Sequence, residues 1–302
     1  MAGSIDFSGI IPASVAGEII SIAAEESAVL TLGRRVPMPS GQQEMPVQTG
    51  LPVAGWVAQP GGRKPFTDLS VDMVNMKAEE VAAVITIPQA YIDDSSIALW
   101  DFARPQIASA IARALDTAVL FGTNAPASFP TGGITAAAYC QTAAGGAGED
   151  AASIANEAMG LVEAEGLTVT GHTADIKAQA VLRNLRDNTG AFLLGPTATQ
   201  SSGLQSFWGY PIVWDQFPAA ETEDFITGHW PSLQIGVRQD VTYAISDQAV
   251  VADGAGKVLV SAFQDNTVIM KAHARFGVIV TKDPTEKVPA GAKPFASAAL
   301  TA

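Results

Sequence analysis

Charged residues are scarce in this sequence. Only 16% of its 302 residues are Asp, Glu, Lys or Arg, compared with about 25% in ordinary soluble domains. Mean hydropathy is positive, at +0.22. A surface with so few charges usually becomes an interface, because apolar area is costly to leave in water. The composition therefore favours an obligate oligomer over a free monomer.

Cysteine and histidine are equally sparse. Cys140 is the single cysteine, so no disulfide can form within the chain, and a reducing compartment suits it. His172, His229 and His273 lie more than 40 residues apart from one another and share no ligand spacing. We therefore expect no metal site and no cofactor.

Long apolar runs and clusters of positive charge are missing as well. The two longest uncharged stretches, 117–148 and 188–214, are interrupted by Gly, Pro, Ser and Thr, so no membrane span is expected. Residues 1–6 do not have the pattern of a secretory signal. A net charge of −13 argues against a protein that binds the phosphates of nucleic acid tightly. It does not exclude one that surrounds nucleic acid, since an acidic wall lets a charged polymer slide past.

The sequence also has few motifs of catalysis. Residues 61–65, GGRKP, lack the glycine spacing and the following helix of a phosphate-binding loop. Ser201 and Ser202 are not framed as G-x-S-x-G. Asp93 and Asp94 precede an apolar periodic segment and are interpreted as the start of a helix. We therefore do not expect an enzyme.

The clearest feature that is present is an amphipathic helix within residues 93–123. Its apolar stripe consists of Ile107, Ile111, Leu115 and Val119, flanked by Ala108, Ala112 and Ala118. Arg113 and Asp116 are expected on the opposite side, and Gly122 is expected to cap the carboxyl end. Since proline removes a backbone donor, we predict a short helix capped by Ser96, a break at Pro105 and a long helix to Phe121.

Two features precede this helix. Residues 10–26 have helical apolar spacing and form an amphipathic arm, which packs either on its own domain or on a neighbouring subunit. Strand patterns at 43–48 and 69–74 flank a Gly- and Pro-rich segment, which predicts a long hairpin followed by a strand at 81–88. Trp56 and Val57 would be exposed on this hairpin, which either reaches another subunit or folds back.

The remaining chain alternates between helix and strand signals. We predict helices at 150–166 and 173–186, and strands around Ile134 and at 167–170, 208–214, 225–230, 233–237, 241–245 and 267–280. The last strand places Lys271, His273 and Arg275 on one face, which either is solvated or meets acidic partners.

In this order, the segments resemble the major capsid proteins of tailed bacteriophages that have the Hong Kong 97-type fold. The resemblance spans residues 8–284, and the order of its motifs is more specific than any one of them. In the amino half it rests on Lys64-Pro65, Leu69, Val71, Ile92-Asp93-Asp94 and Gly122-Thr123. In the carboxyl half it rests on LRNLRDNTGAFLLGP at 182–196, WGYPIVW at 208–214 and the strand at 263–280.

This resemblance implies an α+β fold with a defined division of the chain. The expected parts are an N-terminal arm (1–35), an extended loop forming a β-hairpin (36–78), a peripheral domain with the long spine helix (79–133 and 239–285), an axial α/β domain (134–238) and a C-terminal tail (286–302).

The resemblance also implies a function. Copies of the chain would assemble in the host cytoplasm as hexamers and pentamers of an icosahedral virion shell, which encloses double-stranded DNA. A portal protein would be a partner, and a decoration protein could be another. Many relatives begin with a scaffolding segment that is removed later, whereas this sequence starts directly at the arm. Either a separate protein supplies the scaffolding, which Met1 favours, or the numbering begins after processing. No membrane and no cofactor are implied.

Particular residues take roles from the resemblance. Trp56, Val57, Arg63 and Lys64 would contact a neighbouring subunit, and Gly195, Pro196, Ser201 and Gly203 would meet around the capsomer axis. Some relatives join a lysine to a neighbour's asparagine with the help of a glutamate. Lys64 matches the lysine and Asn266 is a candidate for the asparagine, but His273 or nearby residues stand where the glutamate would be.

Two alternatives stay open from the sequence. One is an encapsulin-like compartment on the same fold. The other is an α/β ligand-binding protein or enzyme in which residues 188–203 form a lid.

Overall fold

The computed structural model describes residues 27–57, 63–67, 70–94, 99–145, 149–186, 189, 205–219 and 221–300. The expected arm at 10–26, the cap at Ser96 and the axial-loop residues Gly195, Pro196, Ser201 and Gly203 lie outside these ranges.

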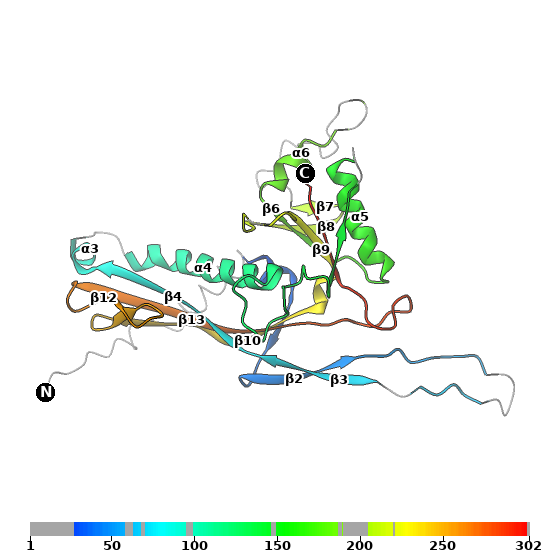
Figure 1. The fold of residues 1–302 in the computed structure, drawn as a ribbon, viewed down its shortest axis with the longest axis horizontal. Coiled ribbons are helices and arrows are strands. Elements are labelled where there is room, and N and C mark those ends of the chain that lie inside the picture. The colour runs from blue at the N-terminus through cyan, green and yellow to red at the C-terminus, as the bar shows by residue number, and fades with distance from the viewer. Residues whose placement is uncertain are drawn as a thin grey trace.

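The helices and strands divide between a long lower layer and a smaller upper unit (Figure 1). In the lower layer they are α2 (Ala28–Leu32), β1 (Arg34–Pro37), β2 (Gln42–Gln48), β3 (Val71–Lys77), β4 (Glu79–Pro88), α3 (Gln89–Asp94), α4 (Leu99–Phe121), β10 (Leu233–Ser246), β11 (Val250–Ala252), β12 (Val258–Ser261) and β13 (Thr267–Val280). In the upper unit they are β5 (Cys140–Ala143), α5 (Ala151–Ala164), β6 (Gly171–Asp175), α6 (Ala178–Arg183), β7 (Ser206–Phe207), β8 (Tyr210–Asp215), β9 (Phe225–Gly228), the 3-10 turn η2 (Trp230–Ser232) and β14 (Phe295–Ala298).

A four-stranded sheet in the order β1-β10-β13-β4 forms the lower layer, and β4 is its edge strand. Helix α4 lies along one face of this sheet (Figure 1). The predicted stripe of Ile107, Ile111, Leu115 and Val119 is buried there, as are Ala108, Ala112 and Ala118. The half-buried side of β4, which alternates along the strand as expected, packs against the same cluster. The sequence predicted both the helix and its buried face.

The upper unit is a six-stranded sheet in the order β5-β14-β9-β6-β8-β7, packed with α5 and α6. The chain passes from this sheet to the lower one through η2, between β9 and β10. Trp230 is fully buried at this junction, where its Nε1 donates to Gly171 O at 2.9 Å and its ring meets Phe295 edge-on at 5.4 Å. This residue therefore joins the two sheets in one continuous core.

Several predictions about α4 and its surroundings are corrected by the structure. The helix runs from Leu99 through Pro105 without the predicted break, because the packed stripe that follows the proline offsets the donor lost there. Asp116 is buried instead of facing solvent, whereas Arg113 is exposed. Gly122, at φ +70°, takes the left-handed conformation expected of its capping role.

The predicted strand around Ile134 is absent, since this residue lies in a series of turns. Its backbone N donates to Val119 O at 2.8 Å, and Thr135 N donates to Leu120 O at 3.1 Å. These bonds satisfy carbonyls at the end of α4, which have no partner within the helix. The strand β5 begins six residues later, at Cys140.

In the upper unit the predicted elements are shifted along the chain. The strand expected at 167–170 is β6, four residues later, so Thr173–Asp175 are strand and not helix, and α6 is only Ala178–Arg183. β6 is buried along its whole length, and such strands lack the alternation that locates a half-exposed one. Residues 286–302, expected as a tail, contribute β14, which pairs with β5 and β9 in the middle of the sheet.

Strands expected at 233–237 and 241–245 are one strand, β10, with irregular register between Val237 and Thr242. Its partner β13 has the predicted bounds, and the predicted apolar face of β13 is largely buried. Lys271 on the other face is exposed, while His273 and Arg275 are partly covered.

Candidate functional site: surfaces for contact between copies

The most conspicuous surface is the hairpin of β2 and β3, which leaves the lower layer on the side opposite to α4 and β12 (Figure 1). We call residues 49–70 between these strands the hairpin loop. Trp56 is fully exposed, at 105%, and Phe66 is 85% exposed. Val57 is 42% exposed, and Arg63 and Lys64 are also exposed. The hairpin and the exposure of Trp56 and Val57 agree with the sequence analysis, and Phe66 adds a second aromatic ring.

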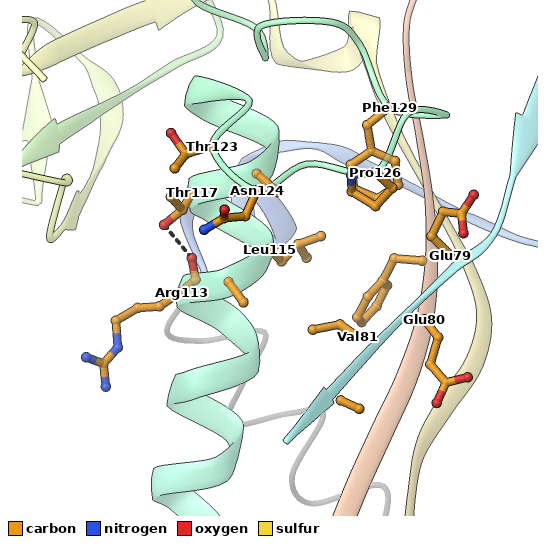
Figure 2. Close-up of a pocket in the computed structure, with 14 residues that line it drawn as sticks. Glu79, Glu80, Val81, Arg113, Leu115, Thr117, Thr123, Asn124, Pro126 and Phe129 are labelled. Atoms are coloured by element: carbon orange, nitrogen blue, oxygen red, sulfur yellow. Dashed lines mark hydrogen bonds between the residues drawn. The ribbon is translucent and has the colours of Figure 1, made fainter. Parts of the chain in front are cut away.

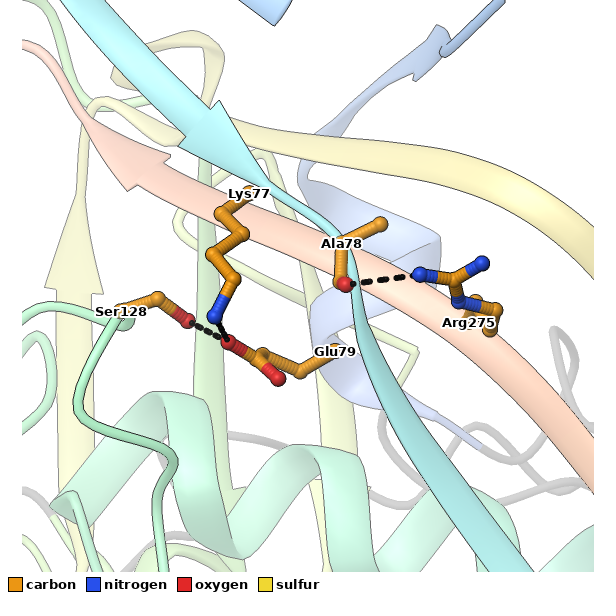
Figure 3. A network of polar contacts seen from close by, with 5 residues as sticks. All are labelled: Lys77, Ala78, Glu79, Ser128 and Arg275. Carbon is orange, nitrogen blue, oxygen red and sulfur yellow. Dashed lines mark hydrogen bonds and ion pairs between the residues drawn. The ribbon is translucent and has the colours of Figure 1, made fainter. Parts of the chain in front are cut away.

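A polar network fixes the point at which the hairpin leaves the sheet (Figure 3). Lys77 Nζ lies 2.8 Å from Glu79 Oε1, and Ser128 Oγ donates to the same oxygen at 2.9 Å. These two contacts, Lys77 first, lower the pKa of Glu79 below its usual value. On the other side of the chain, Arg275 donates to Ala78 O at 3.5 Å. Arg275 on β13 and Ser128 in the segment after α4 thus contact the short stretch where β3 leads into β4.

Apolar packing supports the same point. Met38 and Met76 are buried in a small cluster with Ala78 and Ile279, at the base of the hairpin. They lie over Gly236 and Gly277, which face each other across β10 and β13. A Cβ on Gly236 would come within 2.3 Å of both methionine sulfur atoms. The two glycines therefore make room for the methionines that seat the hairpin on the sheet.

A groove lies between α4 and the beginning of β4, with a volume of about 440 Å³ (Figure 2). Its apolar lining includes Val81, Leu115, Ala118, Phe129 and Phe276. Acidic residues line it on the β4 side, and Arg113 leaves the helix on the side away from β4. This largely apolar lining suits a surface that packs against another apolar surface.

Buried carboxyl groups join α4 to two other elements. Asp116 accepts from Ser27 Oγ at 2.6 Å, from Ala28 N at 3.1 Å and from Val29 N at 3.1 Å, all at the beginning of α2. Burial, and then the nearby carboxylate of Asp215 on β8, raise the pKa of Asp116 to about 7. The pKa of Asp215 is also raised, mainly by burial.

The residues proposed for cross-linking are far apart within one chain. Lys64 lies on the hairpin loop, whereas Asn266 lies between β12 and β13 at the other end of the lower layer (Figure 1). Asn266 is exposed at φ +47°, and its carbonyl accepts from Gln89 N at 2.8 Å. His273 Nε2 lies 3.0 Å from Thr242 Oγ1. A bond between Lys64 and Asn266 would therefore have to join two different copies.

A second apolar surface was not found by sequence reasoning. The β11–β12 hairpin exposes Val250, Val258 and Leu259, and Phe263 beyond it is 79% exposed. The sequence does contain the pattern of a hairpin at this place, because apolar runs at 249–252 and 258–263 flank the turn-forming residues DGAGK.

Within the part of the chain that the structure describes, no group of three His, Cys, Asp or Glu residues could hold a metal ion. No helix there has the length and apolarity needed to cross a membrane.

The sequence matches a known protein family over most of its length. The phage capsid family matches residues 8–285, which is nearly the whole sequence. The chain belongs to the phage capsid family.

Individual relatives of this capsid protein are distant in sequence. The probable major capsid protein gp17 of Mycobacterium phage L5 is 23% identical over 286 residues, covering 91% of this chain and 87% of the relative. A solved structure from Microbacterium phage Oxtober96 is 26% identical, with a TM-score of 0.73 and coverage of 90% of both chains. A solved capsid of a native GTA particle has a TM-score of 0.62 at 16% identity, covering 100% of this chain and 95% of that one.

These comparisons confirm the Hong Kong 97-type fold expected from the order of motifs. The protein is a structural component of a phage virion, a major capsid protein that assembles into a shell, and is not an enzyme. The encapsulin-like and ligand-binding alternatives have no support.

Proposed function

We propose that the capsid protein forms hexamers and pentamers that close into an icosahedral shell around double-stranded DNA. The observation that carries this proposal is the exposure of Trp56 and Phe66 at the end of a hairpin whose base is fixed. A monomer would leave both rings in water, whereas a neighbouring copy would cover them. In such a shell the upper unit would lie around the capsomer axis as the axial domain, and the lower layer would lie outside it as the peripheral domain.

The shell would enclose the DNA without binding it tightly. The net charge of −13 disfavours tight phosphate contacts, so the packaged polymer would remain free to move along the inner wall. A portal protein would admit the DNA, and a separate scaffolding protein or a decoration protein would assist or cover the shell. Assembly would take place in the host cytoplasm.

Two finer roles belong to the same proposal. Gly195, Pro196, Ser201 and Gly203 would meet their equivalents around the capsomer axis. Lys64 of one copy and Asn266 of another are the candidates for a covalent cross-link. Assembled particles that gave only a monomer band on a denaturing gel would exclude this bond.

The main test is electron microscopy of the purified chain, alone and after co-expression with candidate scaffolding proteins from the same genome. We expect closed shells of uniform diameter with fivefold vertices. A chain that stays monomeric at high concentration under all these conditions, with the Trp56 ring shielded in the free molecule, would contradict the proposal.

A further inference from the structure

We propose that Asp116 on α4 and Asp215 on β8 share one proton, and that the loss of this proton releases β8 from α4 while α2 stays bound to α4. The pair is then a proton-controlled contact between the lower layer and the upper unit. This inference goes beyond the proposed function, because it concerns the folded single chain and holds whether or not copies close into a shell.

The two carboxyl groups meet where the lower layer contacts the upper unit. Asp116 is buried on α4, and Asp215, the last residue of β8, is half-buried beside it. A side-chain hydrogen bond links the two groups. Ionised carboxylates only accept hydrogen bonds, so a bond between two carboxyl groups requires a proton on one of them.

The partners of Asp116 indicate where the proton lies. Its Oδ1 accepts from Ser27 Oγ at 2.6 Å and from Val29 N at 3.1 Å. Its Oδ2 accepts one such bond, from Ala28 N at 3.1 Å, which leaves a lone-pair site of this oxygen for the proton. Burial also disfavours the charged form of a carboxyl group. Asp116 therefore holds the proton and donates it in the bond to Asp215.

The charges that face the pair decide when the proton is lost. Burial, and then the charge of Asp215, raise the pKa of Asp116 from 3.8 to about 7. Burial also raises the pKa of Asp215, and Asp175 on the adjacent β6 adds to this effect, whereas the exposed Arg113 opposes it. Lys177 lies 3.7 Å from Asp175 and offsets part of its charge. Because the folded pKa is raised, the proton is held in acid and lost as the pH rises through about 7.

Loss of the proton changes the two contacts of Asp116 in opposite directions. The donors of α2 bind an ionised carboxylate more strongly than a neutral carboxyl group, since the hydrogen bonds become charge-assisted. In contrast, two ionised carboxyl groups repel each other in a partly buried site. The contact that depends on the proton is therefore the one between α4 and β8.

Apolar contacts hold the two units together after the pair separates. Phe121, at the end of α4, lies edge-on to Phe217 with 4.9 Å between the ring centroids. Trp230 is buried where the chain passes from the upper sheet to the lower one. None of these side chains titrates in this pH range. The upper unit can thus tilt about these contacts without unfolding.

Distance measurements between two spin labels test the release. Ala110→Cys places one label on an exposed position of α4, and Asn156→Cys places the other on α5 of the upper unit. The native Cys140 stays unlabelled, because burial raises its pKa to about 11 and keeps the thiol protonated. An excess of unlabelled chain ensures that only pairs within one copy are measured. We expect a narrow distance distribution at pH 6 and a broader, shifted one at pH 8.5.

Asp215→Asn provides the same contact without a shared proton. Its amide oxygen can accept from Gln216 N, as Asp215 Oδ1 does at 2.7 Å, and its amide N–H can donate to the ionised Asp116. The distribution measured at pH 6 should therefore persist at pH 8.5 in this variant. Glu44→Gln, which removes an exposed carboxyl group on β2, is the matched control and should keep the pH dependence of the unaltered chain.

Infrared difference spectroscopy tests the proton itself. The band of a protonated carboxyl group should be present at pH 6 and lost at pH 8.5. It should be absent from Asp215→Asn, because a fourth donor then stabilises the ionised form of Asp116.

Two kinds of result would overturn the inference. A spectrum of the unaltered chain without this band would exclude the shared proton. Equal distance distributions of the unaltered chain at both pH values, or an Asp215→Asn chain that broadens as the unaltered chain does, would exclude the release. Neither result depends on the formation of shells, which electron microscopy tests separately.

Discussion

At the scale of single residues, Asp116 has the most consequential environment. It is 1% exposed, and three donors from the beginning of α2 converge on its carboxylate. The other charged groups around the pair are Asp175 on β6, which raises the pKa of Asp215, and Arg113 on α4, which lowers it. Lys177 lies 3.7 Å from Asp175. The carboxyl group of Asp116 thus connects α4 with the beginning of α2, and it lies near Asp215 on β8 of the upper sheet.

Because the folded pKa of Asp116 is raised from 3.8 to about 7, its protonated form favours folding. Its stabilisation is fully present below about pH 4 and is lost as the pH rises toward 7. We expect this loss to be on the order of a few kcal/mol, at about 1.4 kcal/mol per pKa unit. Asp116→Asn, which cannot ionise, should flatten the slope of unfolding free energy between pH 4.5 and 7.5. Urea unfolding titrations at four pH values in this range measure the slope.

The matched control is Asp150→Asn, at the exposed N-cap of α5, where no side-chain hydrogen bond is made. This change should leave the slope as it is in the unaltered protein. Equal slopes for Asp116→Asn and the unaltered protein would show that the carboxyl group of Asp116 titrates normally.

At the scale of elements, the direction of the hairpin depends on close packing at its base. Two buried methionines can pack over the pair formed by Gly236 on β10 and Gly277 on β13 only because neither glycine has a side chain. The sulfur atoms of Met38 and Met76 occupy the space that a side chain would need. The two glycines are therefore needed for the packing of the hairpin on the sheet, and not for the backbone conformation of β10 or β13.

Gly236→Ala should therefore destabilise the folded chain by about 1–3 kcal/mol, the usual cost of overpacking a filled core. Gly160→Ala is the control, since an added Cβ on α5 meets nothing within 4 Å. It should stabilise the protein by up to about 1 kcal/mol through helix propensity. Chemical unfolding of both variants measures the difference, and equal effects of the two changes would contradict the packing argument.

At the scale of the whole molecule, folding and assembly use different parts of the chain. The two sheets share a core around Trp230, to which the hairpin loop contributes none of its described residues. Thr49 N donates to Ser70 O at 3.0 Å, so the strands still face each other where the loop begins. The loop can thus be removed without exposing the core.

We expect that replacing residues 50–69 by Asn-Gly, which favours a two-residue hairpin turn, leaves the fold unchanged and abolishes shells. Circular dichroism and thermal unfolding would match those of the full chain, while electron microscopy would show no closed particles. Normal shells from the shortened chain would mean that the loop is dispensable for assembly.

The sequence by itself determined the features that depend on local periodicity. The stripe on α4, the strand β13 and the alternating strands of the hairpin were predicted because their residues repeat at the spacing of one buried face. The exposure of Trp56 and Val57 followed from the Gly- and Pro-rich segment around them. The order of these segments was sufficient for the family and the fold.

Only the tertiary structure decided the features that depend on distant partners. Asp116 resembles a surface residue until the N–H groups of Ala28 and Val29, nearly ninety positions away, are placed beside it. β14 becomes a central strand, and the helix continues through Pro105, because packing with remote residues outweighs local preference. Burial and pairing are properties of the folded arrangement, and no local pattern in the sequence encodes which remote residue will provide them.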